Sequence, residues 1–351
     1  MTRIAIDAMG GDNAPRATVE GAVWAAHDYN VAIELVGKED IIKAELARIA
    51  KEGIKPKSTT LNLLQYKLKV DLNKLDIKIT NAEEVIEMGE APGQAIRKKK
   101  DSSIVRAVDA VATGSSQAVV AAGSTGAAMA SSLFGLGRLP GISRPAIATT
   151  LPTMKKPVVL LDAGANSECT PEMLTQFAIM GAIFSKNILG IENPAIGVLN
   201  IGEEASKGNP LALNTHKMLE EMGDKINFVG NVEGKELFWG DCNVVVCDGF
   251  VGNVALKTIE GASSMLFTMI KDEFKNNIIS MMIGLLAKPF MKRIYKKINY
   301  EEFGGALLLG VKGITVISHG RSTAYAIKNA VRVAKEAVEK GVNSKISAFY
   351  E

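Results

Sequence analysis

The sequence of 351 residues is poor in several features that would define a class of protein. It has only three cysteines, Cys169, Cys242 and Cys247, and this odd number offers no disulfide framework and fits a reducing compartment such as the cytosol. No metal site is expected, because the cysteines lack the spacing of zinc ligands and the three histidines lie far apart in the chain. No run of about 18 apolar residues occurs, so no segment is expected to span a bilayer.

The balance of charge and the low aromatic content argue against a nucleic-acid-binding protein. Positive and negative residues nearly balance at a formal net charge of +3, and aromatic residues make up only 5% of the chain. A basic groove with stacking aromatic side chains is therefore not expected, and nucleic acid is not an expected partner. The N-terminus has no positively charged lead into an apolar stretch, so we expect no signal peptide.

What the sequence does contain is a regular alternation of strand-like and helix-like segments. Short apolar, β-branched runs predict strands at residues 3–7, 31–37, 76–80, 117–123, 157–164, 195–202, 226–230, 243–249 and 314–320. Helical patterns lie at residues 14–28, 39–52, 102–113, 125–136, 170–190, 211–223 and 321–340. Such alternation predicts an α/β fold whose mostly parallel sheet is flanked by helices. The length favours a single two-lobed domain over residues 1–351.

Six of the predicted strands end in glycine-rich, polar segments. These segments are DAMGGDN (7–13), AAGSTGA (121–127), DAGANSE (162–168), NIGEEASKGN (200–209), CDGFVGN (247–253) and SHGRS (318–322). In open α/β sheets, ligands bind beyond the carboxyl ends of the strands, where loops and helix N-termini meet. One glycine-rich end is ordinary turn chemistry, but six indicate a site that suits an oxyanion such as phosphate.

The first of these ends, in RIAIDAMGGDNAP, raises the question of why two glycines stand between two carboxylates. A capping Asp12 or Asn13 and Pro15 in the first helical turn predict a helix start that is ready for an anion. Carboxylates are unfavourable beside an anion. We therefore expect Asp7 and Asp12 to orient amides or to pair with Lys or Arg from another strand end.

Other side chains at these ends allow more than one role. Ser124 and Thr125 in AAGSTGA either donate hydroxyls to an anion or only cap the following helix. Lys207 and Lys257 are cations near the ends, although lysines are ordinarily surface charges. His319 ends a strand before a helix and is either structural or catalytic. Neither dinucleotide-fingerprint nor Walker spacing is present, so no nucleotide is indicated.

Two further segments lie outside this pattern. Residues 263–298 join an apolar run to a basic cluster, and the candidate membrane contacts are Met281, Met282, Leu285, Leu286, Lys292 and Arg293. Such a segment is typical of an amphipathic helix on an anionic lipid surface, and the alternative is a helical pair buried in a dimer interface. The run RKKKDSS (97–103) is either a solvated helix start or a surface for an acidic partner.

Ordered motifs along the chain resemble one known family. The motifs IAIDAMGGDNAP, AIRKKKDSS, GISRPAIATTLP, DAGANSECTPEMLTQFAIMG, LNIGEEASKGN, CDGFVGNVALKTIEG and ISHGRS occur in the order seen in the acyl-carrier-protein:phosphate acyltransferases of bacterial phospholipid synthesis. The resemblance runs from about residue 3 to about residue 335, and its first motif and CDGFVGN are specific to the family. Ser124 stands where that family usually has asparagine. The resemblance therefore implies a binding role for the backbone at this position, but not for the side chain.

The resemblance implies a fold similar to isocitrate and isopropylmalate dehydrogenases, shared with phosphotransacetylases, in a homodimer. It implies transfer of a fatty acyl group from acyl carrier protein to inorganic phosphate, with no cofactor. The acyl phosphate would then feed a glycerol-3-phosphate acyltransferase. The resemblance also implies a cytoplasmic protein held peripherally at the inner face of the cell membrane, which favours the lipid interpretation of residues 263–298.

Residues and resemblance together lead to a set of site predictions. The candidate catalytic residues are His319, Lys257 and Lys207. The candidate substrate-binding residues are Asp7, Gly10, Gly11, Asp12, Asn13, Gly123, Ser124, Thr125, Gly126, Asp162, Asn166, Asn200, Asp248, Gly249 and Asn253. The candidate carrier-protein contacts are Arg97, Lys98, Lys99 and Lys100. Phosphate is expected to attack the thioester directly, because no Ser–His–Asp or Cys–His arrangement is recognisable.

Two rival functions remain at this point. A dehydrogenase on the same fold would use a nicotinamide cofactor and a divalent metal, with Asp162 and Asp248 as the candidate ligands. A non-enzymatic membrane scaffold for lipid-synthesis enzymes is the other rival. The polar strand ends argue against a scaffold, which has no need of a phosphate-ready site.

Overall fold

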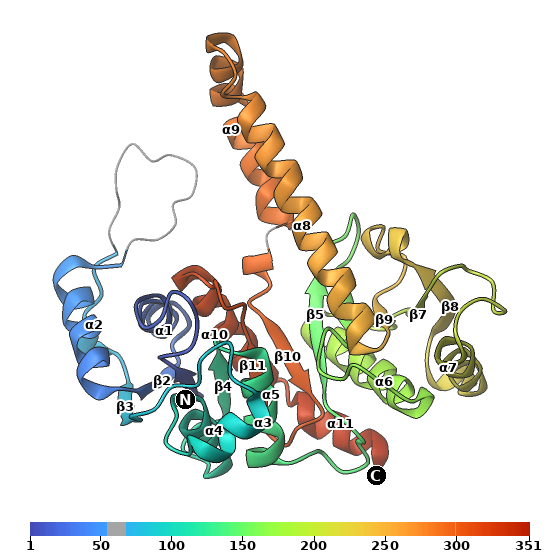
Figure 1. Cartoon of the computed structure of the whole chain (residues 1–351), viewed down its shortest axis with the longest axis horizontal. Coiled ribbons are helices and arrows are strands. Elements are labelled where there is room, and N and C mark those ends of the chain that lie inside the picture. The colour runs from blue at the N-terminus through green and yellow to red at the C-terminus, as the bar shows by residue number, and fades with distance from the viewer. Residues whose placement is uncertain (55–67, 299) are drawn as a thin grey trace.

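The computed structural model describes residues 1–54, 68–298 and 300–351. The strands of these residues form one sheet (Figure 1). In their order across the sheet they are β3 (Ile77–Asn81), β2 (Ala32–Gly37), β1 (Arg3–Asp7), β4 (Ala118–Ala121), β11 (Ile314–Ile317), β10 (Ala306–Leu309), β5 (Ala146–Leu151), β6 (Val158–Leu161), β9 (Val244–Val246), β7 (Ile196–Asn200) and β8 (Phe228–Glu233). The predicted α/β class with a mostly parallel sheet is confirmed.

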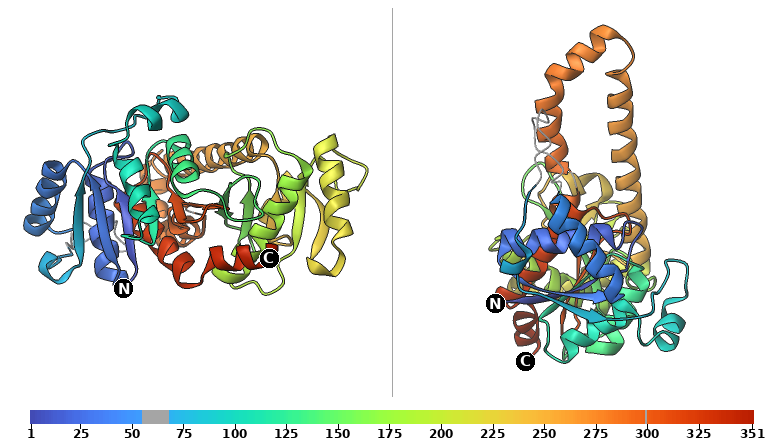
Figure 2. Two further views of the ribbon diagram at one scale, coloured as in Figure 1. Left: turned by 90° about the horizontal axis from the view of Figure 1, so that it is seen from below. Right: turned by 90° about the vertical axis from the view of Figure 1, so that its left-hand side faces the viewer.

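Helices cover both faces of this sheet (Figures 1 and 2). They are α1 (Arg16–Tyr29), α2 (Glu39–Glu52), α3 (Pro92–Lys98), α4 (Ser103–Ala112), α5 (Thr125–Leu136), α6 (Pro171–Ile188), α7 (Pro210–Glu221), α8 (Gly249–Glu273), α9 (Ile278–Ile298), α10 (Ala324–Glu339) and α11 (Val342–Tyr350). The predicted strands and helices are all found, with bounds shifted by a few residues. Strands β5 and β10 and helices α3 and α11 are additional to the prediction.

The sheet consists of two parallel blocks that run in opposite directions. The first block is β3-β2-β1-β4-β11, and the second is β6-β9-β7-β8. Between them, β10 is antiparallel to β11 and β5, and β5 is antiparallel to β6. The six glycine-rich ends therefore lie at two edges of the sheet, three at each.

Sheet twist offsets much of this reversal. Adjacent strands are rotated by about 20–25°, so the five steps from β4 to β9 amount to roughly 100–125°. A twist of this size acts against the reversal between the two blocks. One apolar cluster on a single face of the sheet includes Ala121 and Ile317 from the first block, Ala163 after β6, Ala127 of α5 and Leu256 of α8. The two sets of strand ends therefore share an apolar floor.

Helices α8 and α9 form a hairpin that projects far from the sheet (Figures 1 and 2). The rings of Phe267 and Tyr295 meet edge to face across it, with centroids 5.4 Å apart. Pro289 lies inside α9. Over the described residues, we find no helix with the length and apolarity needed to cross a membrane.

Candidate active site

The loops after β1 and β4 lie against each other at the carboxyl end of the first block. A Cβ atom on Gly10 would lie 2.4 Å from Oδ2 of Asp7 and 3.0 Å from the backbone nitrogen of Gly123. Gly11 has a φ of +107°, and a Cβ there would lie 2.7 Å from the carbonyl oxygen of Ala122. Because only glycine fits both positions, the glycine pair allows two strand ends to touch through their backbones.

The loop after β11 joins the same group. The amide of Asp12 donates to the carbonyl of Gly320 at 2.8 Å. Nδ2 of Asn13 donates to the carbonyls of Arg321 and Ser322 at 3.1 and 3.2 Å. Three of the six predicted strand ends therefore meet, and we call residues 7–13, 121–127 and 318–322 the first loop cluster.

Asp7 and Asp12, the two carboxylates at the first strand end, take the two roles that the sequence suggested, which are to orient amides and to pair with a cation. Oδ1 of buried Asp7 accepts from the amides of Met9 and Gly10 at 3.2 and 3.1 Å. Burial raises the pKa of Asp7, and these hydrogen bonds act in the opposite direction. Oδ2 of Asp12 lies 3.9 Å from Nε of Arg321, in an exposed pair. Asp7 thus orients amides, and Asp12 faces a cation from another strand end.

The predicted cap of the first helix is wrong. Helix α1 begins at Arg16, and Pro15 occupies its N-cap position without a side-chain hydrogen bond. The physical reason is that the side chains expected to cap it are engaged elsewhere, since Asn13 donates to the loop after β11 and Asp12 faces Arg321.

Helix α5 begins directly after the second strand end. Oγ of Ser124 accepts from the amide of Ala127 at 3.3 Å, so Ser124 is an N-cap, which is one of the two roles considered for it. Amides in the first turn of a helix have no partner within the helix. The N–H groups of Thr125 and Gly126 can therefore bind an anion beside the glycine pair.

His319 stands at the tip of the loop after β11. Its side chain is exposed, and its Nδ1 accepts from the amide of Arg321 at 3.1 Å. A neutral imidazole in this arrangement carries its proton on Nε2. In that form Nε2 is the donor of the ring.

In the second block, Asp162 organises the turn after β6. Its Oδ1 accepts from the amides of Ile147, Gly164 and Ala165 at 3.0, 3.1 and 2.9 Å. Its Oδ2 accepts from the amide and the side-chain Nδ2 of Asn166 at 2.7 and 2.9 Å. Burial raises the pKa of Asp162, and the donors oppose that rise. The side chain thus fixes the DAGANSE backbone rather than facing solvent.

The start of α8 packs on this turn. The amide of Gly249 donates to the carbonyl of Asn166 at 2.7 Å. A Cβ on Gly252 would lie 1.9 Å from the carbonyl oxygen of Asp162, so the helix approaches as closely as a backbone allows. Oδ1 of Asp248 accepts from an amide of the first turn at 2.9 Å and caps the helix.

The loop after β7 is held by its own asparagine. Nδ2 of Asn200 donates to the carbonyl of Lys207 at 3.0 Å, and its Oδ1 accepts from the amide of Ile201 at 2.8 Å. The side chains of Lys207 and Lys257 are exposed. A Cβ on Gly164 would lie 3.5 Å from Asn253, which adds that asparagine to the group. We call residues 162–168, 200–209 and 247–253 the second loop cluster.

Sequence reasoning missed a segment that lies over the first loop cluster. A Cβ on Gly320 would lie 3.0 Å from the methyl group of Met88, and one on Gly126 would lie 2.5 Å from Cγ of Pro92. Pro92 begins α3, which leads into the predicted basic run at residues 97–100. Both views of Figure 2 show this segment standing out from the body of the molecule. In the sequence, the only sign of this segment is Pro92, which can begin a short helix.

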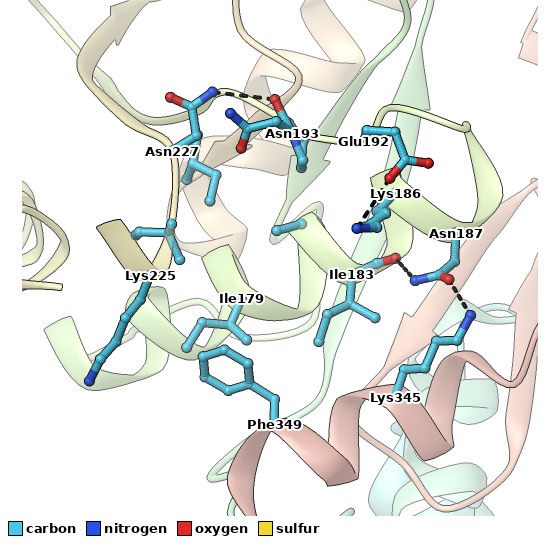
Figure 3. A pocket seen from close by; sticks show the side chains of 14 residues that line it. Ile179, Ile183, Lys186, Asn187, Glu192, Asn193, Lys225, Asn227, Lys345 and Phe349 are labelled. Atoms are coloured by element: carbon cyan, nitrogen blue, oxygen red, sulfur yellow. Dashed lines mark hydrogen bonds and ion pairs between the residues drawn. The ribbon is translucent and has the colours of Figure 1, made fainter. Parts of the chain in front are cut away.

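Two hollows lie at the two ends of β7. One, of about 270 Å³, lies between the starts of α7 and α8 and is lined by Asn200 and Asp248 of the second loop cluster. The other, of about 400 Å³, lies beside Ile196 at the opposite end of the strand, with Lys186, Lys225 and Lys345 at its rim (Figure 3). It is larger but contains no predicted site residue. No group of three or more His, Cys, Asp or Glu that could hold a metal occurs among the described residues.

Comparison with solved structures identifies the fold. A phosphotransacetylase from Streptococcus pyogenes matches with a TM-score of 0.60 at 15% identity, over 96% of this chain and 94% of that one. A 4-hydroxythreonine-4-phosphate dehydrogenase from Klebsiella pneumoniae matches with a TM-score of 0.51 at 13% identity, over 96% and 99% of the two chains. The fold is therefore the one that phosphotransacylases share with dehydrogenases, as the sequence predicted.

Comparison of sequences identifies the family. The model of the fatty acid synthesis protein family matches residues 2–345, so the chain belongs to this family. A phosphate acyltransferase from Halothermothrix orenii is 48% identical over 341 residues, which are 97% of this chain and 96% of that protein. The family resemblance read from the motifs is confirmed, and the chain is an acyltransferase.

Proposed function

We propose that the chain transfers a fatty acyl group from an acyl carrier protein thioester to inorganic phosphate, giving acyl phosphate. The observation that carries this proposal is the first loop cluster. Three glycine-rich strand ends touch there, beside the free amides of α5 and the exposed ring of His319. Amides of Gly11, Asn13 and residues 123–126 bind the phosphate, since helix N-termini and glycine loops suit that ion. The amides of Gly10 and Asp12 instead hold the loop, because they donate to Asp7 and Gly320.

Phosphate itself is the nucleophile in this reaction. One of its oxygens forms the bond to the thioester carbon, and the C–S bond breaks to release the carrier thiolate. A thiol pKa of about 8–9 makes that group a good leaving group. Burial raises the pKa of Cys169 and of Cys242 to about 12, so these thiols are poor nucleophiles near neutral pH. The remaining needs are the positioning of phosphate and the stabilisation of the tetrahedral oxyanion.

His319 and the two lysines divide the remaining tasks. Nε2 of His319 donates to the oxyanion or protonates the departing thiolate. Lys207 and Lys257 supply positive charge for the phosphate from the second loop cluster and from α8. The second loop cluster, with Asn166, Asn200, Gly249 and Asn253, surrounds the thioester. The side chain of Asn200 and the amide of Gly249 hold the loops in place there. Asp162 and Asp248 are positioning residues, because their carboxylates hold amides of the surrounding loops.

The carrier protein docks on the basic run at residues 97–100. Arg97, Lys98 and Lys100 are exposed, whereas Nζ of Lys99 donates to the carbonyl of Val85 at 2.7 Å and pairs with Glu90. The run begins in the last turn of α3, whose first residue packs beside the α5 start. An acidic carrier bound there would lie beside the first loop cluster.

The helical hairpin α8–α9 docks on the membrane surface. Met281, Met282, Leu285 and Leu286 are 59, 64, 70 and 75% exposed, and Arg293 lies on the same helix. An apolar face beside basic residues suits an anionic lipid surface. The protein thus works as a cytoplasmic homodimer at the inner face of the membrane and hands acyl phosphate to a glycerol-3-phosphate acyltransferase.

An assay of the purified chain tests this function. Acyl carrier protein thioester and phosphate are mixed with the protein, and free thiol is followed together with acyl phosphate. Both products are expected in equal amounts and only when phosphate is present. Thiol release that needs no phosphate contradicts the proposal. A thermal shift with NAD and magnesium but none with phosphate would favour the dehydrogenase rival.

A further inference from the structure

We propose that the hollow of about 270 Å³ at the end of β7 binds the alkyl chain of the acyl substrate. This inference rests on the proposed function, because it assigns a part of the same substrate. The hollow lies between α6 and the starts of α7 and α8, on the right of Figure 1. It adjoins Asn200 and Asp248, so a chain bound there would leave its thioester at the second loop cluster.

The floor of the hollow is apolar and buried. Leu174, Val198 and Cys247 are 1, 1 and 4% exposed, and Leu211 and Ala212 of α7 form one wall. Apolar side chains also stand open at the mouth, where Ile201 is 80% and Val251 40% exposed. Exposed apolar groups around an apolar hollow are typical of a ligand site.

The electrostatics of the hollow favour an uncharged ligand. Both helix starts at its rim are already capped, since Asn209 accepts from Ala212 and Asp248 accepts from Val251, each at 2.9 Å. The Asp248 carboxylate would repel an anion, and the described lining contains no Lys, Arg or His. By contrast, the hollow in Figure 3 has lysines at its rim. An alkyl chain therefore fits this hollow better than phosphate does.

The size of the hollow sets the length of chain that it takes. Its volume of about 270 Å³ equals that of about nine water molecules at about 30 Å³ each. Because the mouth of the hollow is open, with Ile201 and Val251 exposed there, we expect only a segment of a long acyl chain to be buried. Each methylene moved out of water then changes binding by about fourfold.

Changes at Leu211 test the inference in two opposite directions. Leu211→Trp fills the wall, and Leu211→Ala enlarges it. Leu213→Trp is the matched control, because Leu213 lies on the same helix, is 37% exposed and does not line the hollow. The kcat/KM of the full chain is measured with carrier thioesters from butanoyl to hexadecanoyl. We expect Leu211→Trp to lower the long-to-short ratio about tenfold, Leu211→Ala to shift the preference to longer chains, and the control to match the wild type.

Direct binding separates this inference from the proposed function. Calorimetry with decanoyl-pantetheine is expected to show binding to the wild type and the control, and at least tenfold weaker binding to Leu211→Trp. Equal binding and an equal chain-length ratio in all variants would overturn the inference while thioester transfer by the wild type stands. If the alkyl chain binds but no acyl transfer occurs, the proposed function is contradicted, whereas the assignment of the hollow to the alkyl chain stands.

Discussion

Single residues decide how closely the strand ends and helix starts approach one another. Gly10 and Gly11 let the loop after β1 touch the loop after β4, and Gly252 lets α8 reach the turn at Asp162. At each of these positions a methyl group would overlap backbone or carboxylate atoms. The geometry of both loop clusters thus depends on the absence of side chains as much as on the polar groups present.

Two glycines of α8 provide a matched test of this dependence. A Cβ on Gly252 would lie 1.9 Å from the carbonyl oxygen of Asp162, whereas one on Gly261 would meet nothing within 4 Å. Gly252→Ala should destabilise the chain by about 1–3 kcal/mol through overpacking. Gly261→Ala should stabilise it by about 0.5–1 kcal/mol, because alanine favours a helix interior. Urea unfolding of both variants measures the difference, and equal effects would contradict this close approach.

His319 is the residue whose loss should most affect turnover. Removal of one oxyanion donor lowers kcat by about 10²–10³-fold, and we expect His319→Ala to fall in this range. Thermal unfolding should change little, because the side chain is exposed. His27→Ala on α1 is the matched control, since His27 is also exposed and lies outside both loop clusters. Wild-type turnover in His319→Ala would remove this residue from the mechanism.

At the scale of elements, the strongest periodic segments were predictable and the short ones were not. The nine predicted strands are apolar runs that end in glycine or polar residues, and the seven predicted helices have a clear apolar face. Strands β5 and β10 escaped prediction, because AIATTL follows a proline and ALLL has only four residues. Their antiparallel pairing depends on contacts between distant segments, and a sequence pattern does not encode such contacts.

The exposed basic residues at the end of α3 allow a test of carrier docking. Arg97, Lys98 and Lys100 are changed to Glu together, while Lys99 is kept because Val85 and Glu90 hold its ammonium group. The KM for acyl carrier protein should rise about tenfold or more, and its dependence on salt should weaken. The KM for acyl-pantetheine should not change.

A charge-matched control completes that experiment. Lys51, Lys217 and Lys340 are also exposed and lie outside the docking run, so their change to Glu alters net charge equally. These reversals should leave the KM for carrier protein near the wild-type value. A similar rise in both triple variants would mean that overall charge, not the run at the end of α3, attracts the carrier.

The α8–α9 hairpin gives the second prediction at this scale. Leu285→Glu with Leu286→Glu should abolish co-sedimentation with vesicles that contain anionic lipid, because two of the most exposed apolar side chains of α9 become charged. Met154→Glu is the control, since Met154 is 77% exposed and belongs to the loop between β5 and β6, not to the hairpin. Co-sedimentation that survives the double change would favour the other interpretation, a helical pair in a dimer interface.

At the scale of the whole molecule, the site depends on a sheet that reverses direction and twists. The sequence predicted the glycine-rich ends and their chemistry, since each follows a recognisable strand. It did not predict that the ends belong to two blocks of opposite direction, because that arrangement results from β5 and β10. The failed helix cap at Asp12 and Asn13 has a similar cause, since both residues face a loop some 300 positions away along the chain.

The most direct test of this account is a crystal of the protein soaked in phosphate. The account predicts density for the ion against the amides of Gly11, Asn13 and residues 123–126, within reach of the ring of His319. Phosphate bound instead among Lys186, Lys225 and Lys345 in the hollow of Figure 3, with the first loop cluster empty, would contradict it.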